Sequence, residues 1–200
     1  IMALVYIIGS LTIIVGHGDM FWGALKSIIV GAFDPVAATG GVIGAGVKEA
    51  IRYGVARGLF SNEAGMGSTP HAHAIAKVRH PGEQGLAALV GLFVDTFVVL
   101  NMTAFVILTT GVLDGTTTGI SLTQKAFEVG LGPIGNGFVA VCLLFFAFTT
   151  IIGWYFFAEQ NVKYLFGNRW VSTYRVIVLC FLMLGSFLHV NLVWELADLF

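Results

Sequence analysis

Long apolar runs separated by short polar stretches dominate the chain, and the length of each run predicts its structure. A helix needs about 20 residues to cross the roughly 30 Å hydrocarbon layer of a membrane. By that measure the runs predict membrane-crossing helices, and the first and last of them are parts of crossings that continue elsewhere. We therefore expect the sequence to be an internal piece of a longer chain. The predicted crossings are residues 1–15, 21–53, 84–112, 135–158, 171–188 and 190–200.

Residues 33–41 interrupt the second crossing with residues that helices avoid. Pro35 lacks a backbone donor, and five glycines stand within residues 31–46, where each costs about 1 kcal/mol relative to alanine. An unwound segment inside a bilayer needs protein or a water-filled cavity around it, because lipid cannot satisfy free N–H and C=O groups. The stretch predicts a discontinuous helix beside an internal ligand site, although a glycine-rich packing face would give the same composition.

Two further segments are too polar to cross a membrane. Residues 57–80 are rich in helix-capping side chains, which predicts a structured loop at the membrane surface with a short helix near residues 71–74. Residues 114–133 are moderately amphipathic and predict a short helix that lies outside the bilayer and packs on the protein.

The composition agrees with an all-α polytopic membrane protein. The chain is 57% hydrophobic and 10% charged, with a mean hydropathy of +0.90, which is far from the usage of soluble domains. A formal net charge of −1 gives no indication of a nucleic-acid partner. Cys142 and Cys180 both lie in apolar runs, which predicts small core residues rather than a disulfide or a metal pair.

The basic residues predict the orientation in the membrane. Eight of the ten flank the same side of the predicted crossings, and by the positive-inside rule that side is cytoplasmic. The loop 57–80 is then cytoplasmic and the segment 114–133 extracellular, in a multi-pass protein of the cell (plasma) membrane. The eight are Lys48, Arg52, Arg57, Lys77, Arg79, Lys163, Arg169 and Arg175.

Asp95 stands in the middle of a predicted crossing, with Thr96 and Asn101 nearby. An ionisable residue at that depth is costly unless it is paired or lines a cavity, so Asp95 is a candidate for a coupling residue, with a structural polar link as the alternative. His71 and His73 form an H-x-H pair, but residues two apart do not share a helix face, and we predict no resident metal and no cofactor.

Three ordered blocks resemble a known family. The sequence RGLFSNEAGMGSTPHAHA at residues 57–74 is similar to the signature loop of the alanine/glycine:cation symporter family, which includes sodium:alanine symporters. The sequence AFDPVAATGG at residues 32–41 resembles the broken helix of that family, although its Asp-Pro pair departs from the small polar residues found in many relatives. The sequence FAFTTIIGWY at residues 146–155, followed by YLFG, resembles a later scaffold helix.

The resemblance implies a leucine-transporter-like fold of two five-helix repeats inverted in the membrane. It implies a sodium- or proton-coupled importer of a small neutral amino acid such as alanine or glycine, with sodium as a co-transported ligand. The chain would hold about half of such a transporter. Its partners would be the amino acid, the lipid bilayer and the remainder of its own chain, which would complete the sites.

On this resemblance the broken helix would bind the amino acid through its own backbone. Carbonyl groups near Ala32 and Phe33 would face the ammonium group, and the segment from Thr39 would meet the carboxylate at a helix N-terminus. Gly40 and Gly41 would leave room only for a small side chain. Phe33 and Trp154 would form walls, although each aromatic residue taken singly could equally face lipid or core.

The same resemblance implies a cation site on the helix at residues 135–158. The hydroxyls of Thr149 and Thr150 and the carbonyl of Phe146 one turn earlier would supply half of the oxygen ligands. A threonine that bonds back to its own helix is the alternative. Glu63 and Arg57 in the signature loop are candidates for gating, or for capping and pairing of a structural kind.

A different function class stays open from the sequence alone. A membrane-embedded hydrolase could use the polar loop at residues 61–73, although the chain shows no nucleophile elbow and no H-E-x-x-H pattern. Coupled uptake of an amino acid would separate the transporter from the hydrolase.

Overall fold

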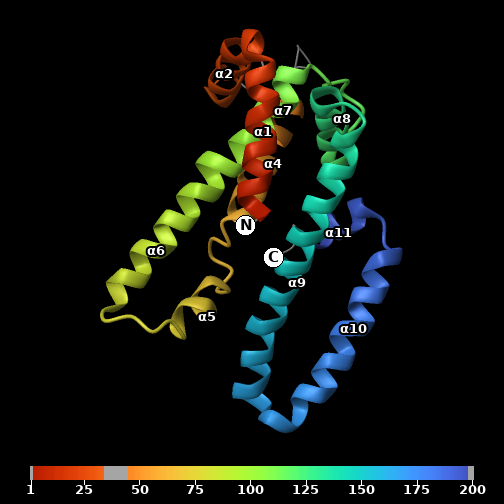
Figure 1. Ribbon diagram of the computed structural model, residues 1–200. Helices are drawn as coiled ribbons and strands as arrows, with labels where there is room; N and C mark the ends of the chain where they lie inside the picture. The colour runs from red at the N-terminus through yellow and green to blue at the C-terminus, as the bar shows by residue number, and fades with distance from the viewer. Residues whose placement is uncertain (1, 34–44, 198–200) are drawn as a thin grey trace. The chain divides into compact units, whose positions relative to one another are not determined.

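The described residues, 2–33 and 45–197 of a computed structural model, form helices joined by turns (Figure 1). Contacts between the helices divide the chain into two compact units. The first unit comprises Ile1–Val55 and His80–Ala147, and the second comprises Ala56–Arg79 and Phe148–Phe200. The all-helical architecture predicted from the apolar runs is therefore present in the described part of the chain.

The first unit opens with two short helices, α1 (Met2–Gly16) and α2 (Gly18–Phe33), which meet at an angle of 108°. With 15 and 16 residues, each is shorter than the roughly 20 residues that a single crossing needs. The bend falls at His17, between two glycines, where the ring Nδ1 lies 3.0 Å from the carbonyl oxygen of Ile13. The second helix thus begins before residue 21, where the sequence predicted its start, and Asp19 in its first turn favours this earlier start through the helix dipole.

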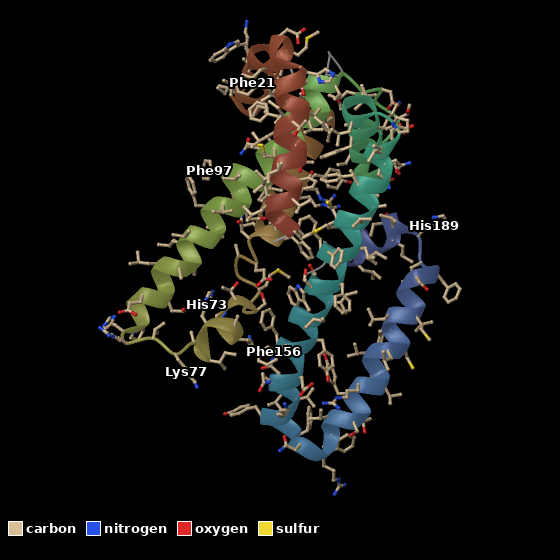
Figure 2. All side chains as sticks on the ribbon, in the orientation of Figure 1. Phe21, His73, Lys77, Phe97, Phe156 and His189 are labelled. Carbon is tan, nitrogen blue, oxygen red and sulfur yellow. The ribbon has the colours of Figure 1, made fainter. Side chains whose placement is uncertain are left out.

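The next long helical stretch, Pro81–Thr110, is α-helical at both ends and π-helical in the middle. It consists of α6 (Pro81–Phe93), a π-helix (Val94–Leu100) and α7 (Asn101–Thr110). The stretch starts with a proline, whose missing N–H is not needed there, and ends at Gly111, which has φ of +66°. Phe97 lies on the side of this stretch away from α1 and is 62% exposed (Figure 2).

A hydrophobic core lies where α1, α2 and α7 meet α8 (Gly119–Leu131) and the first part of α9 (Ile134–Phe166). Phe127 is fully buried between the rings of Tyr6 and Phe138, with ring centroids 5.5 and 5.6 Å away. Phe21 of α2 stacks on Phe105 of α7 at 5.0 Å. The buried apolar members are Tyr6, Ile13, Ile14, Val106, Val112, Ala126, Phe127, Val139 and Cys142.

Asp114 organises the turn that leads into α8. Its carboxylate accepts hydrogen bonds from the backbone N–H groups of Thr116 and Thr117, from the Thr117 hydroxyl, and from Lys125 Nζ at 2.9 Å. The Thr117 N–H group first, and then the Lys125 ammonium, hold the pKa of the Asp114 carboxyl well below its usual range. A helix within the predicted segment 114–133 is present, and its Ala126 and Phe127 face the core.

The second unit contains the end of α4 (Ala45–Ser61), α5 (Thr69–Ala74) and the later part of α9. A short 3₁₀ turn (Asn168–Trp170) connects α9 to α10 (Val171–Phe187), which runs back alongside it as an antiparallel hairpin (Figure 1). The chain continues into α11 (Val190–Ala197). Because α4 continues to Ser61, the first residues of the predicted loop 57–80 are helical.

Three of the described helices are long and apolar enough to cross a membrane: Pro81–Thr110, Ile134–Phe166 and Asn168–Phe187. The bent pair α1 and α2 passes the same test only when taken together. α9 has 33 residues, a length of about 50 Å, and extends well beyond the predicted range 135–158. The predicted break at residues 33–41 lies outside the described residues, apart from Phe33.

Candidate functional site

The predicted cation ligands all lie on the unbroken helix α9. Thr149 and Thr150 follow the carbonyl of Phe146 by three and four residues, so the three groups fall within about one turn. Neighbouring residues are about 100° apart around an α-helix, so the two hydroxyls start from different sides of α9. The three groups are therefore close along the helix axis but do not all point the same way, and further oxygen ligands for a cation would have to come from other segments.

Thr150 and Trp154 line one groove between α9 and α10. The groove has a volume of about 380 Å³, and its other walls are mostly apolar. The Trp154 ring also meets the Phe157 ring edge-on at 6.1 Å. A predicted cation ligand and a predicted wall of the substrate site therefore share a face of α9. The remaining residues of the groove are Ile151, Tyr155, Ala158, Tyr174, Val178 and Leu182.

The predicted substrate residues at the broken helix are only partly described. Ala32 and Phe33 are the last two residues of α2, so their carbonyl groups stand at the C-terminal end of that helix as described. Thr39, Gly40 and Gly41 lie outside the described residues. The backbone contacts proposed for an amino acid at this stretch remain predictions.

Phe146 points its ring into a chamber of the first unit. The chamber has a volume of about 240 Å³ and is lined in part by Tyr6 and Thr103. The Tyr6 and Thr103 hydroxyls share a hydrogen bond of 2.7 Å, and the Phe146 ring meets the Tyr6 ring edge-on at 5.9 Å. The side chain of Phe146 thus belongs to the core, which leaves only its carbonyl for the predicted cation site.

Asp95 lies in the first turn of the π-helix Val94–Leu100, a feature that the sequence did not predict. π-helical turns are rare and often occur at functional sites. The side-chain amide of Asn101 donates to the carbonyls of Thr96 and Phe97, at 3.0 and 3.2 Å, and so supports the wider turn. The cluster of Asp95, Thr96 and Asn101 was the available signal in the sequence for an unusual segment.

The signature loop is held in shape by Glu63. Glu63 has a φ of +51°, unusual for a residue with a side chain, and its carboxylate accepts hydrogen bonds from the Ser68 and Thr69 hydroxyls at the start of α5. Arg57 stands at the end of α4 with its guanidinium carbon 3.4 Å from the centre of the Trp194 ring, a cation–π contact with α11. Glu63 orders the loop, and Arg57 joins α4 to α11.

His71 attaches α5 to the later part of α9. Its Nε2 lies 3.0 Å from Asn161 Oδ1, its Nδ1 lies 3.2 Å from the Ser68 carbonyl oxygen, and its ring packs near Phe157. Among the residues that the structure describes, no group of three or more His, Cys, Asp and Glu side chains could hold a metal ion. The histidine therefore connects elements of the second unit.

Sequence reasoning missed a charged network at the end of the α9–α10 hairpin. Glu159 is only 8% exposed; its carboxylate lies 2.6 Å from Lys163 Nζ and 3.8 Å from a terminal nitrogen of Arg175. Arg175 Nε donates to the Tyr155 hydroxyl at 2.9 Å, and the Tyr155 and Tyr174 rings stack at 5.6 Å. The Glu-to-Lys spacing of four residues was a readable signal for the first pair, whereas the partner in α10 required the fold.

Comparison with known proteins assigns the family. Residues 1–200 match the sodium:alanine symporter family. The chain is 46% identical to an uncharacterized transporter of Haemophilus influenzae over 99% of this chain and 44% of that protein.

Two named relatives agree with this match. The amino-acid carrier protein AlsT of Bacillus subtilis is 37% identical over 100% of the chain and 42% of its own length. The sodium/alanine symporter AgcS of Methanococcus maripaludis is 39% identical over 98% of the chain and 43% of its own length. The chain thus spans less than half the length of these relatives. It belongs to the sodium:alanine symporter family, a family of multi-pass transporters of the cell membrane and not of enzymes.

Proposed function

We propose that the chain forms part of a secondary active symporter that imports a small neutral amino acid, alanine or glycine, together with sodium or protons. The observation that carries this proposal is the family match over all of residues 1–200. A relative named as a sodium/alanine symporter and another named as an amino-acid carrier support the same class of cargo. Apolar helices of membrane length supply the setting that such transport needs.

The overall architecture in this proposal is a five-plus-five inverted repeat. The chain corresponds to 44% of the length of the Haemophilus relative, so other helices of the whole protein would complete the fold and the binding sites. Alternating access would then follow when joint binding of cation and amino acid shifts the equilibrium between outward-open and inward-open states.

The amino acid would bind beside the interrupted helix. Carbonyl groups at the end of α2, near Ala32 and Phe33, suit an ammonium group, since a helix C-terminus carries partial negative charge. Thr39, Gly40 and Gly41 would meet the carboxylate and limit the size of the side chain, and Phe33 and Trp154 would close over the cargo. In this arrangement a larger amino acid would be excluded by shape.

The cation would bind at Thr149 and Thr150, with the carbonyl of Phe146 as a third ligand. Hard cations prefer several oxygen ligands, and these three oxygens lie within one turn of α9. Asp95 on its π-helical turn is a second candidate for coupling, because ionisable residues at membrane depth and π-helical turns both mark functional sites. Arg57 and Glu63 would set the position of the cytoplasmic loop during gating.

The hydrolase alternative is set aside. The family to which the chain belongs consists of transporters. Within the polar loop at residues 61–73, the Ser68 hydroxyl donates to Glu63 and His71 contacts Asn161, so both of these groups have structural partners.

Uptake by the full-length protein tests the proposal. Liposomes containing the protein receive labelled alanine under an inward sodium gradient, an inward proton gradient, or no gradient. We expect accumulation above equilibrium with at least one of the two gradients, and competition by unlabelled glycine. Equal uptake under all three conditions would refute ion coupling.

A further inference from the structure

The His71 ring lies between two oxygen acceptors. Its Nε2 is 3.0 Å from Asn161 Oδ1 on α9, and its Nδ1 is 3.2 Å from the carbonyl oxygen of Ser68. The Asn161 amide is oriented by its own helix, because its Nδ2 donates to the Phe157 carbonyl at 3.3 Å. The opposite orientation of this amide would set two oxygens against each other. Both ring nitrogens of His71 therefore face groups that can only accept a hydrogen bond.

The number of bonds that His71 can make depends on its charge. A neutral imidazole ring has one N–H group and one acceptor nitrogen, whereas a protonated ring has two N–H groups. The neutral ring can thus donate to Ser68 or to Asn161 but not to both, and its other nitrogen then faces an oxygen lone pair. The protonated ring donates to both acceptors, and one of these two bonds reaches from α5 to α9.

Two neighbours of the ring favour its charged form. The Phe157 ring centroid is 6.1 Å from that of His71, about the limit at which an aromatic face attracts a cation. The Glu63 carboxylate bonds to the Ser68 and Thr69 hydroxyls, which places a negative charge at the start of the short helix that carries His71. Both contacts act in the same direction as the two oxygen acceptors.

The other charged groups on the adjoining elements are paired or exposed. Glu159 and Lys163 stand two residues before and after Asn161, about 200° around α9, and bond to each other at 2.6 Å. As a pair of opposite charges they favour neither form of the His71 ring. Two basic residues after α5 oppose the charged form, but they are exposed to solvent, which screens them. The remaining titratable residues of α5 and the segment after it are His73, Lys77, Arg79 and His80.

From this geometry we propose that His71 is a proton-operated latch between the signature loop and α9. Protonation adds the second hydrogen bond and ties α5 to α9, and loss of the proton leaves one bond and loosens the tie. The latch is therefore closed at the acidic end of the range in which histidine side chains change charge, about pH 5 to 8, and opens as the pH rises. The predicted topology makes it a sensor of cytoplasmic pH. The proposal does not rest on the transport function, since both partners lie within the second unit.

Hydrogen exchange of the full-length protein in detergent tests the latch. Exchange of the amides at residues 71–76 is measured by mass spectrometry at about pH 5.5 and about pH 8 and corrected for intrinsic rates. We expect about tenfold greater protection at the lower pH, the value of one hydrogen bond to a charged group. His71→Gln keeps a donor but cannot take up a proton, so its protection should be equal at the two pH values. His80→Asn removes another histidine and keeps a capping side chain for α6, so it should retain the response.

Equal protection at both pH values in the unmodified protein would overturn the proposal. A full response in H71Q, or its loss in H80N, would do the same, because another group would then carry the response.

A second pair of variants tests the partner on α9 without changing the histidine. Asn161→Asp places a carboxylate against Nε2, which favours the charged ring, so the protection should persist to a higher pH. Asn168→Asp makes the same change at an exposed position in the turn after α9 and should leave the pH profile where it is. An unchanged profile in N161D, or an equal shift in N168D, would show that the charged ring does not bind Asn161, which contradicts the latch.

Discussion

The two halves of α9 bury opposite kinds of side chain. In the first half, Val139 and Cys142 are each 2% exposed and join the core of the first unit. In the second half, residues 148–166, Glu159 is the buried residue, and apolar side chains such as Phe148 and Ile152 are 59% and 50% exposed. The first part of this continuous helix is thus stabilised by apolar packing, and the later part by ion pairs and hydrogen bonds.

The difference shows which apolar surfaces are covered by contacts within the described chain. Phe127, Tyr6 and Phe138 pack against one another, so the first unit has a core formed by its own helices. The α9–α10 hairpin has stacked tyrosines and a charged network, and its apolar faces are left for lipid or for other protein segments. Substitutions should therefore act through packing in the first region and through charge in the second.

The largest effect is expected at Phe127. Phe127→Ala removes a fully buried ring and should lower the free energy of unfolding by about 3–5 kcal/mol. Phe148→Ala removes the same ring from an exposed position on α9 and should change it far less. Thermal unfolding of the full-length protein in detergent compares the two, and similar losses would contradict the packing difference.

A backbone contact offers a second test of the packed region. A Cβ atom at Gly135 would overlap the carbonyl oxygen of Phe127, whereas a Cβ atom at Gly137 would meet nothing within 4 Å. We expect Gly135→Ala to destabilise the protein by about 1–3 kcal/mol. Gly137→Ala, two residues away, should be tolerated. Equal stability of the two variants would show that α8 and α9 are not in close contact.

The charged region should respond to loss of its carboxylate. Glu159→Gln leaves Lys163 and Arg175 without their anionic partner, so the unfolding temperature should fall, though by less than in Phe127→Ala. Glu128→Gln makes the same chemical change at an exposed position of α8 and provides the control. If Glu159→Gln and the control unfold at the same temperature, the charged network does not stabilise the protein.

The smallest effect on overall stability is expected at Asp114, so its contribution is measured at the neighbouring amides. Asp114→Ala should speed amide hydrogen exchange at Thr116 and Thr117 with little change in overall unfolding. Because the pKa of Asp114 is lowered in the folded protein, its contribution is complete at neutral pH and is lost as the pH falls through the lowered pKa. Protection at these two amides should thus persist in the unmodified protein to a pH below the usual carboxyl range. Loss of protection near pH 4 would contradict the ordering of this turn by the ionised carboxylate.

The apolar runs predicted the long helices because hydropathy reports directly on burial in lipid or protein. They did not predict that α9 would continue to Phe166, since Glu159 and Lys163 look like residues beyond the membrane until their pairing is known. The hydrogen bond between Tyr6 and Thr103 joins residues 97 positions apart, and no local pattern contains such a pair. The π-helical turn at Asp95 was not predicted either, because the polar cluster of Asp95, Thr96 and Asn101 marks an unusual segment without specifying how the helix winds there.

The sodium dependence of alanine uptake tests the central functional claim most directly. Initial rates are measured against external sodium for full-length protein carrying Thr149 and Thr150, for the variant with both replaced by valine, and for Thr173→Val on α10 as the control. We expect the double variant to require more sodium for half-maximal uptake and T173V to require no more than the unmodified protein. The same sodium curve for all three proteins would contradict a cation site on α9.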